Sequence, residues 1–167
     1  FITDVVKPGE DKLAEAGDEI ERSEYLGLLL QMRQEAKDTG MWLPHMPEEW
    51  GGMGLGHVEL AMVQAEAGKT RLGPWIFNCM APDEGNMHTL LHWGTDEQKD
   101  KYLKALCDGY TMSCFAMTEP EVAGSDPTLI RTTAVLDGDE WVVNGHKWFI
   151  SNARRASFAI LIARTED

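Results

Sequence analysis

The sequence predicts an α+β fold: an all-helical N-terminal bundle over residues 1–110, followed by the first strands of an antiparallel β-domain over residues 111–167. Two observations lead to this prediction. In the first region apolar side chains recur at helical spacing, whereas after Tyr110 they fall into short runs that are rich in β-branched residues and separated by turn residues. Helices in one region and strands in the next are typical of α+β proteins or of two domains.

The first expected helix covers residues 19–39 and ends at Gly40, a residue suited to the left-handed conformation that terminates helices. Its apolar residues lie at roughly helical spacing: Ile20, Leu26, Leu29, Leu30 and Met32. A loop rich in proline and glycine over residues 44–56 allows sharp turns, and a second helix is expected over residues 57–67.

Two more helices are expected before the strands begin. Pro82 is suited to open the third helix, which ends at Gly94. Its inner face is predicted to hold Met87, Leu90 and Leu91. Thr95 to Gln98 has the pattern of a capping box, in which the two side chains bond backbone N–H groups of the first helical turn. The fourth helix therefore runs from Thr95 to Leu106.

Five extended segments are expected in the second region, at residues 112–118, 129–136, 140–144, 147–151 and 158–164. The sequence Asp137-Gly138-Asp139 predicts a hairpin turn between the second and the third. So few strands leave open edges, which folded proteins cover or close, and we therefore expect the sheet to continue beyond this chain. The first residue, Phe1, is also what a piece of a longer protein would show.

Composition excludes several classes of function. The formal net charge is −13, whereas phosphate contacts to nucleic acid need clustered Lys and Arg. No apolar run approaches the ~18 residues of a membrane span, and no signal peptide is visible. The three cysteines, Cys79, Cys107 and Cys114, are too widely spaced for a zinc site or a disulfide framework, which favours a reducing compartment.

Two segments contain the residue types of a binding site. In the first, residues 115–126, a strand ends in a turn where Thr118 and Ser125 supply hydroxyls and Gly124 allows a ligand to approach the backbone closely. Successive N–H groups in such a turn form an anion-binding concavity, so a planar heterocycle with a pyrophosphate would suit the set. Composition alone favours an ordinary strand with a Pro-Gly turn, because such turns are common.

The second segment, residues 146–152, combines aromatic side chains that can stack on a flat ring with the Ser151 hydroxyl, which can donate to a ring nitrogen. Taken alone, an amphipathic strand with Trp148 and Phe149 in packing roles is the simpler interpretation.

Other side chains capable of chemistry are assigned ordinary roles. His88 and His92 share a helix face but lack the neighbouring Glu of the zinc-peptidase pattern, so we interpret them as a packed or solvated pair and predict no metal site. Glu119 and Glu121 lie in an extended segment, where two carboxylates need not converge as acid and base. Cys114 has no activating group nearby and is interpreted as buried.

Taken together, motifs over roughly residues 41–164 resemble the acyl-CoA dehydrogenase family of flavoproteins. In chain order they are Leu43-Pro44 with Pro47-Glu48-Glu49-Trp50-Gly51-Gly52-Met53-Gly54, Gly94-Thr95-Asp96-Glu97-Gln98-Lys99 with Tyr102-Leu103, Phe115 to Asp126, and Gly138-Asp139-Glu140-Trp141 leading into Asn144-Gly145-His146-Lys147 and Phe149-Ile150-Ser151-Asn152. The ordered set is far more specific than any one motif. Residues 42–47 and 81–87 resemble the subgroup with the large human members and many bacterial relatives.

The resemblance implies an N-terminal helical domain over residues 1–110, an incomplete middle β-domain over residues 111–167 and a C-terminal four-helix domain outside this chain. It implies an FAD-dependent oxidoreductase of fatty acid and lipid metabolism, which removes the α proton of an acyl-CoA thioester while the β hydrogen leaves as hydride to flavin N5. The family's catalytic carboxylate lies in the C-terminal domain. No catalytic residue is therefore assigned here, and the isolated fragment is expected to be inactive.

By motif position, the resemblance assigns flavin contacts to both segments. Thr118 would bond the pyrimidine edge, Ser125 would lie near the pyrophosphate and the route of the CoA thioester, and the Ser151 hydroxyl would point toward N5. The cofactor-binding set is Phe115, Ala116, Met117, Thr118, Gly124, Ser125, Phe149, Ile150 and Ser151, with Ser125 also assigned to substrate. The family usually has Trp in place of Phe149 and Thr in place of Ser151, so the aromatic plane and the hydroxyl are kept.

The resemblance also implies an acyl-CoA substrate, an electron-transfer flavoprotein as acceptor and a homodimer or homotetramer, with no nucleic acid and no membrane span. The compartment would be the cytoplasm in a bacterium, and the mitochondrion or peroxisome in a eukaryote. Two alternatives stay open: an acyl-CoA oxidase, nitroalkane oxidase or flavin monooxygenase on the same scaffold, or a non-catalytic interaction module that kept the fold.

Overall fold

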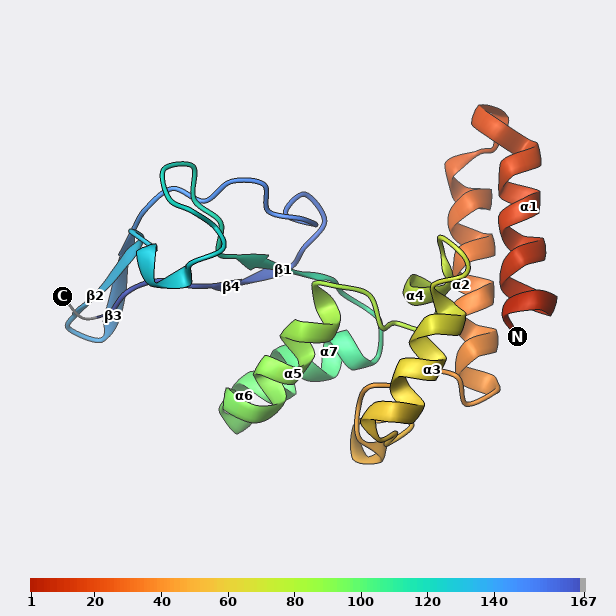
Figure 1. The fold of residues 1–167 in the computed structure, drawn as a ribbon, viewed down its shortest axis with the longest axis horizontal. Helices are drawn as coiled ribbons and strands as arrows, with labels where there is room; N and C mark the ends of the chain where they lie inside the picture. The colour runs from red at the N-terminus through yellow and green to blue at the C-terminus, as the bar shows by residue number, and fades with distance from the viewer. Residues whose placement is uncertain (166–167) are drawn as a thin grey trace. The chain divides into compact units, whose positions relative to one another are not determined.

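The computed structural model describes residues 1–165, apart from the side chain of Asp18. The chain forms two compact units, Phe1–Gly109 and Tyr110–Asp167. The first unit contains the helices and the second contains the strands (Figure 1). The predicted order, helices first and strands afterwards, is therefore confirmed.

The helical unit contains, in chain order, a π-helical turn Ile2–Val6, α1 Lys7–Ala16, a 3-10 turn Gly17–Glu19, α2 Arg22–Asp38, a 3-10 turn Glu48–Trp50, α3 His57–Ala67, α4 Gly73–Ile76, α5 Asp83–Trp93, α6 Asp96–Gln98, a π-helical turn Lys99–Leu103 and α7 Lys104–Cys107. α1 and α2 lie side by side (Figure 1). All four predicted helices are present, and the one expected over residues 57–67 matches α3 at both ends. On the predicted inner face of α5, Met87 and Leu90 are buried and Leu91 is half-buried.

The helix ends follow the signals in the sequence. Gly40 after α2 has a φ of 72°, and Gly109 after α7 has a φ of 74°, in the left-handed region that favours glycine. The Thr95 hydroxyl accepts a hydrogen bond from the Gln98 N–H at 3.2 Å, and the Gln98 side chain accepts one from the Thr95 N–H at 3.0 Å. The predicted capping box is thus formed at the start of α6.

A buried cation joins several parts of the helical unit. Arg33 of α2 donates to the Trp75 carbonyl at 2.5 Å and to Asn78 Oδ1 at 3.3 Å. Its guanidinium carbon also lies 4.6 Å from the centroid of the Trp42 ring and 4.3 Å from that of the Trp75 ring. Burial lowers the pKa of Arg33 to about 10, although Asp83 acts in the opposite direction. One side chain thereby ties α2 to the loop that follows it and to α4.

The second unit contains β1 Ser113–Ala116, a 3-10 turn Pro127–Leu129, β2 Thr133–Asp137, β3 Glu140–Asn144 and β4 Phe158–Leu161. β2 and β3 form the predicted antiparallel hairpin, with Asp137 opposite Glu140 and Gly138 in the turn at a φ of 62°. β1 pairs with β4 in parallel, with Ser113 opposite Phe158. Of the two strand pairings within residues 1–165, the β2–β3 pairing is antiparallel and the β1–β4 pairing is parallel, whereas the sequence predicted an antiparallel sheet.

The long connection between β1 and β4 allows them to pair in parallel. Parallel neighbours need a crossover of about a dozen residues or more, and residues 117–157 supply it, with the β2–β3 hairpin inside the crossover. Residue patterns within each strand do not reveal this partnership, because it depends on the path of the chain between them.

The prediction of a strand over residues 147–151 is wrong. These residues lie in a loop, in which Phe149 has a φ of 52°, and Asn152 just after it has a φ of 66°. Left-handed residues interrupt an extended strand, so the run of apolar residues that suggested a strand is a bend instead. Three further strands are shorter than predicted, since β1 covers only Ser113–Ala116, β2 begins only at Thr133 and β4 ends at Leu161.

Candidate functional site

The two segments singled out in the sequence meet within the strand unit. The Trp148 N–H donates to the Thr118 carbonyl at 3.1 Å, directly after β1 ends. Lys147 Nζ donates to the Met117 carbonyl at 2.9 Å and to Glu119 Oε1 at 2.9 Å. Residues 117–119 and 147–148 are therefore joined by three hydrogen bonds, one from the backbone and two from a lysine.

Glu119 is the centre of this junction. Its side chain is only 4% exposed, and Lys147 is 10% exposed. The carboxylate accepts hydrogen bonds from the Arg131 N–H at 2.7 Å, from the Thr132 N–H at 2.9 Å and from the Thr132 hydroxyl at 2.5 Å, in addition to Lys147. Donors from two other segments, residues 131–132 and residue 147, thus converge on one buried carboxylate.

The surrounding hydrogen bonds stabilise the negative charge of this carboxylate. Burial raises the pKa of the Glu119 carboxyl. The hydrogen bonds from the Lys147 and Thr132 side chains and from the Arg131 and Thr132 N–H groups together lower it by more, so its pKa falls to about 2. Glu119 is therefore ionised at any ordinary pH. It has no proton to donate, and its lone pairs are taken by protein donors, so its chemistry is structural.

The loop after Lys147 presents an aromatic ring to the surface. Phe149 is 81% exposed, and its ring centroid lies 4.4 Å from that of Trp148. A bulky residue held at positive φ is uncommon and marks a position that its surroundings fix. Further along the same loop, the buried Nδ2 atom of Asn152 has no hydrogen-bond partner among residues 1–165.

The turn after Glu119 folds back on the end of β1. A Cβ built on Gly124 would meet only the Thr118 methyl group, at 3.9 Å, so the two residues are neighbours with space beside them. The turn is closed by Asp126, whose carboxylate accepts hydrogen bonds from the Thr128 N–H and hydroxyl. These bonds lower the pKa of Asp126.

The predicted site residues differ in how exposed they are. Ala116 is buried, whereas Phe115, Met117, Thr118 and Ile150 are half-buried. Gly124, Ser125, Phe149 and Ser151 are exposed. Thr118 lies against both the other segment and Gly124, while Ser125 and Ser151 lie on exposed turns.

Sequence reasoning missed the Glu119–Lys147 pair. It considered Glu119 with Glu121, but the two carboxylates diverge: Glu121 forms an exposed ion pair with Arg131 at 2.9 Å, while Glu119 turns inward to Lys147. The available signal was a pair of opposite charges, each placed within an apolar segment where a charge is costly unless it is paired.

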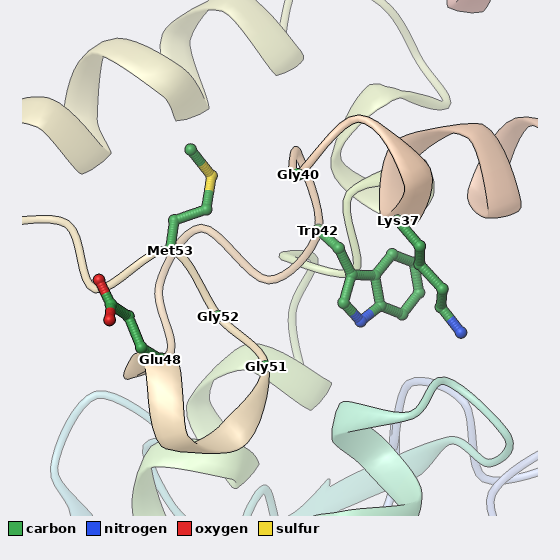
Figure 2. Close-up of a pocket in the computed structure, with 7 residues that line it drawn as sticks. All are labelled: Lys37, Gly40, Trp42, Glu48, Gly51, Gly52 and Met53. Atoms are coloured by element: carbon green, nitrogen blue, oxygen red, sulfur yellow. The ribbon is translucent and has the colours of Figure 1, made fainter.

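The helical unit contains a separate pocket of about 430 Å³. Its lining residues are Lys37, Gly40, Trp42, Glu48, Gly51, Gly52 and Met53 (Figure 2). Lys37 Nζ lies 4.5 Å from the Trp42 ring centroid and donates to the Asp108 carbonyl. None of the predicted binding residues lines this pocket.

A histidine cluster lies in the same unit. The His45 ring centroid is 5.3 Å from that of His88, which stacks on His92 at 6.2 Å. Across residues 1–165, no group of three or more His, Cys, Asp or Glu side chains is placed to hold a metal ion. In that same part of the chain, no helix is long and apolar enough to cross a membrane.

Both units match models of known protein families. Residues 1–110 match the family model described as acyl-CoA dehydrogenase, N-terminal domain, and residues 114–167 match the one described as acyl-CoA dehydrogenase, middle domain. The chain belongs to the acyl-CoA dehydrogenase family. The resemblance noted in the sequence is thereby confirmed, and so is the fold class: a helical N-terminal domain followed by the first strands of the middle domain.

Individual relatives agree with this assignment. Human acyl-CoA dehydrogenase family member 11 is 41% identical over 139 residues, which cover 82% of this chain and 17% of the human protein. A structure from Mycobacterium abscessus assigned to the acyl-CoA dehydrogenases has a TM-score of 0.79 and 37% identity, covering 89% of this chain and 39% of that one. A glutaryl-CoA dehydrogenase from Mycobacterium smegmatis, solved with FADH2, has a TM-score of 0.64 and 30% identity, covering 82% and 35%.

The chain thus spans well under half the length of these relatives. Family membership makes it part of a flavoprotein oxidoreductase family.

Proposed function

We propose that the full-length gene product is an FAD-dependent acyl-CoA dehydrogenase that oxidises the α,β bond of an acyl-CoA thioester. In this proposal the flavin is held by Phe115 to Thr118, by Gly124 and Ser125, and by Phe149 to Ser151, with Ser125 also near the substrate. The supporting observation is the hydrogen bond between the Trp148 N–H and the Thr118 carbonyl, because it brings two hydroxyl-bearing segments against each other.

The residues at this junction suit a flavin. An isoalloxazine ring has a flat apolar face and an edge of nitrogen and oxygen atoms. The chain offers the exposed ring of Phe149 for the face and the hydroxyls of Thr118 and Ser151 for the edge. The buried amide nitrogen of Asn152 is a donor without an acceptor among residues 1–165, and Gly124 leaves room for a ligand beside Thr118.

When bound, FAD supplies a hydride acceptor for the β hydrogen of the acyl group. The residues of this chain bind and orient: Thr118 and Ser151 donate hydrogen bonds, Phe149 covers an aromatic face, and Ser125 donates where phosphate or thioester oxygens pass. The group that removes the α proton is not among the residues assigned here. An electron-transfer flavoprotein as acceptor and a homodimer or homotetramer belong to the same proposal.

The first experiment measures FAD binding to the full-length protein. The wild type is expected to bind FAD, and Thr118→Val or Ser125→Val is expected to weaken binding. Each variant removes one hydroxyl, and a hydrogen bond is worth about 0.5–1.5 kcal/mol, so the Kd should rise roughly 2- to 10-fold. Titration of the stripped protein with FAD, followed by flavin fluorescence, gives the Kd.

Thr89→Val is the matched control for that titration. Its hydroxyl lies on the exposed side of α5 and bonds the Gly85 carbonyl of the same helix, so its loss should leave the Kd unchanged. A full-length protein that ignores added FAD would contradict the proposal and favour the non-catalytic module.

A further inference from the structure

The buried pair of Glu119 and Lys147 connects the segments that carry the proposed flavin contacts, although neither residue is among those contacts. Through its carboxylate, Glu119 is bonded to the backbone N–H groups of Arg131 and Thr132, just ahead of β2. Through Lys147 it is bonded to the segment that leads into Phe149. Lys147 then reaches the Met117 carbonyl, one residue before Thr118.

This arrangement is poorly suited to be a source of stability alone. Both side chains are at least nine-tenths buried, so both lose their hydration. Buried ion pairs often contribute no more to stability than well-packed apolar residues of similar volume, although breaking one partner is costly. What the pair does supply is direction: four donors fix the carboxylate, and the lysine has two acceptors on the same short segment.

The neighbouring glycine agrees with a tightly fitted junction. A Cβ built on Gly145 would lie 2.2 Å from the Thr132 hydroxyl, the same hydroxyl that donates to Glu119. The backbone just before Lys147 therefore runs directly against the residue that holds the carboxylate, which leaves the loop little freedom to shift.

We propose that Glu119 and Lys147 are positioning residues, which hold the Thr118 segment and the Phe149–Ser151 loop in the register that flavin binding requires. The proposal rests on the proposed function, and it extends that function to two residues that make no predicted contact with the flavin. Lys147 acts through the Met117 carbonyl and the loop that follows it, and Glu119 acts by holding Lys147.

The decisive variant is Lys147→Met in the full-length protein. It keeps the length and apolar stem of the side chain and leaves Glu119 bonded to Arg131 and Thr132, but it removes both side-chain bonds between residues 117–119 and 147. The Kd for FAD is expected to rise about tenfold, within the range typical of coupled neighbouring residues. The visible absorption band and the fluorescence of the bound flavin should shift as well, because the ring edge meets displaced hydroxyls.

Two further variants separate positioning from stability. Lys147→Arg keeps a positive charge and N–H donors but has a larger, planar head group, so its Kd for FAD is expected to lie between those of the wild type and Lys147→Met. Glu66→Gln is the matched control for Glu119→Gln: it breaks an ion pair with Lys69 in which both side chains are more than half exposed. Glu66→Gln should leave the Kd unchanged, whereas Glu119→Gln should raise it at least as much as Lys147→Met.

The possible results are distinct. Lys147→Met with wild-type Kd and flavin spectrum, and only a lower melting temperature, would show a purely structural pair and overturn the inference. Should Lys147→Met fail to fold, the comparison of Lys147→Arg with Glu119→Asp decides, since the shorter carboxylate keeps its charge but cannot reach all four donors. A wild type that binds no FAD would instead remove the proposed function, and with it this inference.

Discussion

At the scale of single residues, His45 is a buried group with an acid-dependent cost. It is 7% exposed, and neither of its ring nitrogens has a hydrogen-bond partner among residues 1–165. Burial, and to a lesser extent His88, lowers the pKa of His45 from 6.5 to about 4. The folded protein therefore keeps this ring neutral over a range in which the unfolded chain binds a proton.

The sign of the resulting pH effect is fixed. Between pH 6.5 and about 4 the unfolded state binds more protons than the folded state, so the free energy of unfolding falls as the pH falls, by about 3 kcal/mol over the full range. His45→Leu removes this loss without breaking a hydrogen bond. We expect the variant to lose less melting temperature than the wild type when the pH is lowered from about 7 to about 5.

His57→Leu is the control for this measurement, because His57 is an exposed residue at the start of α3. It should keep the acid sensitivity of the wild type. Equal losses of melting temperature in His45→Leu and the wild type would mean that other groups cause the acid sensitivity. Glu119 affects a lower range, since its stabilising charge is lost only as the pH falls from 4.5 toward 2.

At the scale of elements, the α6 capping box is a local device whose effect can be isolated. Thr95 and Gln98 bond each other's backbone N–H groups in an exposed position. Thr95→Ala removes the hydroxyl acceptor and should destabilise this end of the helix by about 1 kcal/mol. Hydrogen–deuterium exchange of peptides spanning residues 94–100 should accelerate, while exchange in α2 stays unchanged.

Thr89→Ala serves as the matched comparison, because the Thr89 hydroxyl bonds a carbonyl within α5 and caps nothing. Exchange in α5 should be unchanged or slower, since alanine is the better helix former. Faster exchange in both variants would show that loss of a threonine, rather than loss of a cap, is responsible.

The same elements show what the sequence can predict. Helix ends followed local chemistry, as at Gly40 and the Thr95 capping box, because a cap depends only on residues within one turn. The hairpin at Gly138 was predictable for the same reason. The loop at Phe149 was not, since the residues just before it bond Thr118 and Glu119, which lie far away in the sequence.

The candidate site, too, was predictable only in part. The residue types of a ligand site could be recognised in two segments of the sequence, but whether these segments meet depends on the fold. The parallel pairing of β1 with β4 does not explain their meeting, because the chain that enters β4 lies beside the start of β1, where the Ser157 N–H bonds the Met112 carbonyl. The two segments are joined at the other end of β1 by the bonds of Trp148 and Lys147. The inward carboxylate of Glu119 was hidden, since a sequence does not show which of two nearby glutamates turns toward the interior.

At the scale of the whole molecule, one test separates the proposed dehydrogenase from an oxidase on the same scaffold. Both reduce FAD with an acyl-CoA, and they differ in whether reduced flavin is shielded from oxygen. For the full-length protein we expect saturated acyl-CoA to bleach the flavin without air and to yield little peroxide when air is admitted. An electron-transfer flavoprotein should then restore the colour faster than oxygen does.

The 2,3-unsaturated acyl-CoA of the same chain length is the control, because it carries the same CoA group but has already lost the two hydrogens. It should bind without bleaching. Peroxide formed at the rate of flavin reoxidation in air would identify an oxidase, and bleaching by neither compound would leave the flavin-binding fold without the proposed reaction. The Thr118→Val and Lys147→Met variants should lower the fraction of protein that bleaches, because both are expected to bind FAD more weakly.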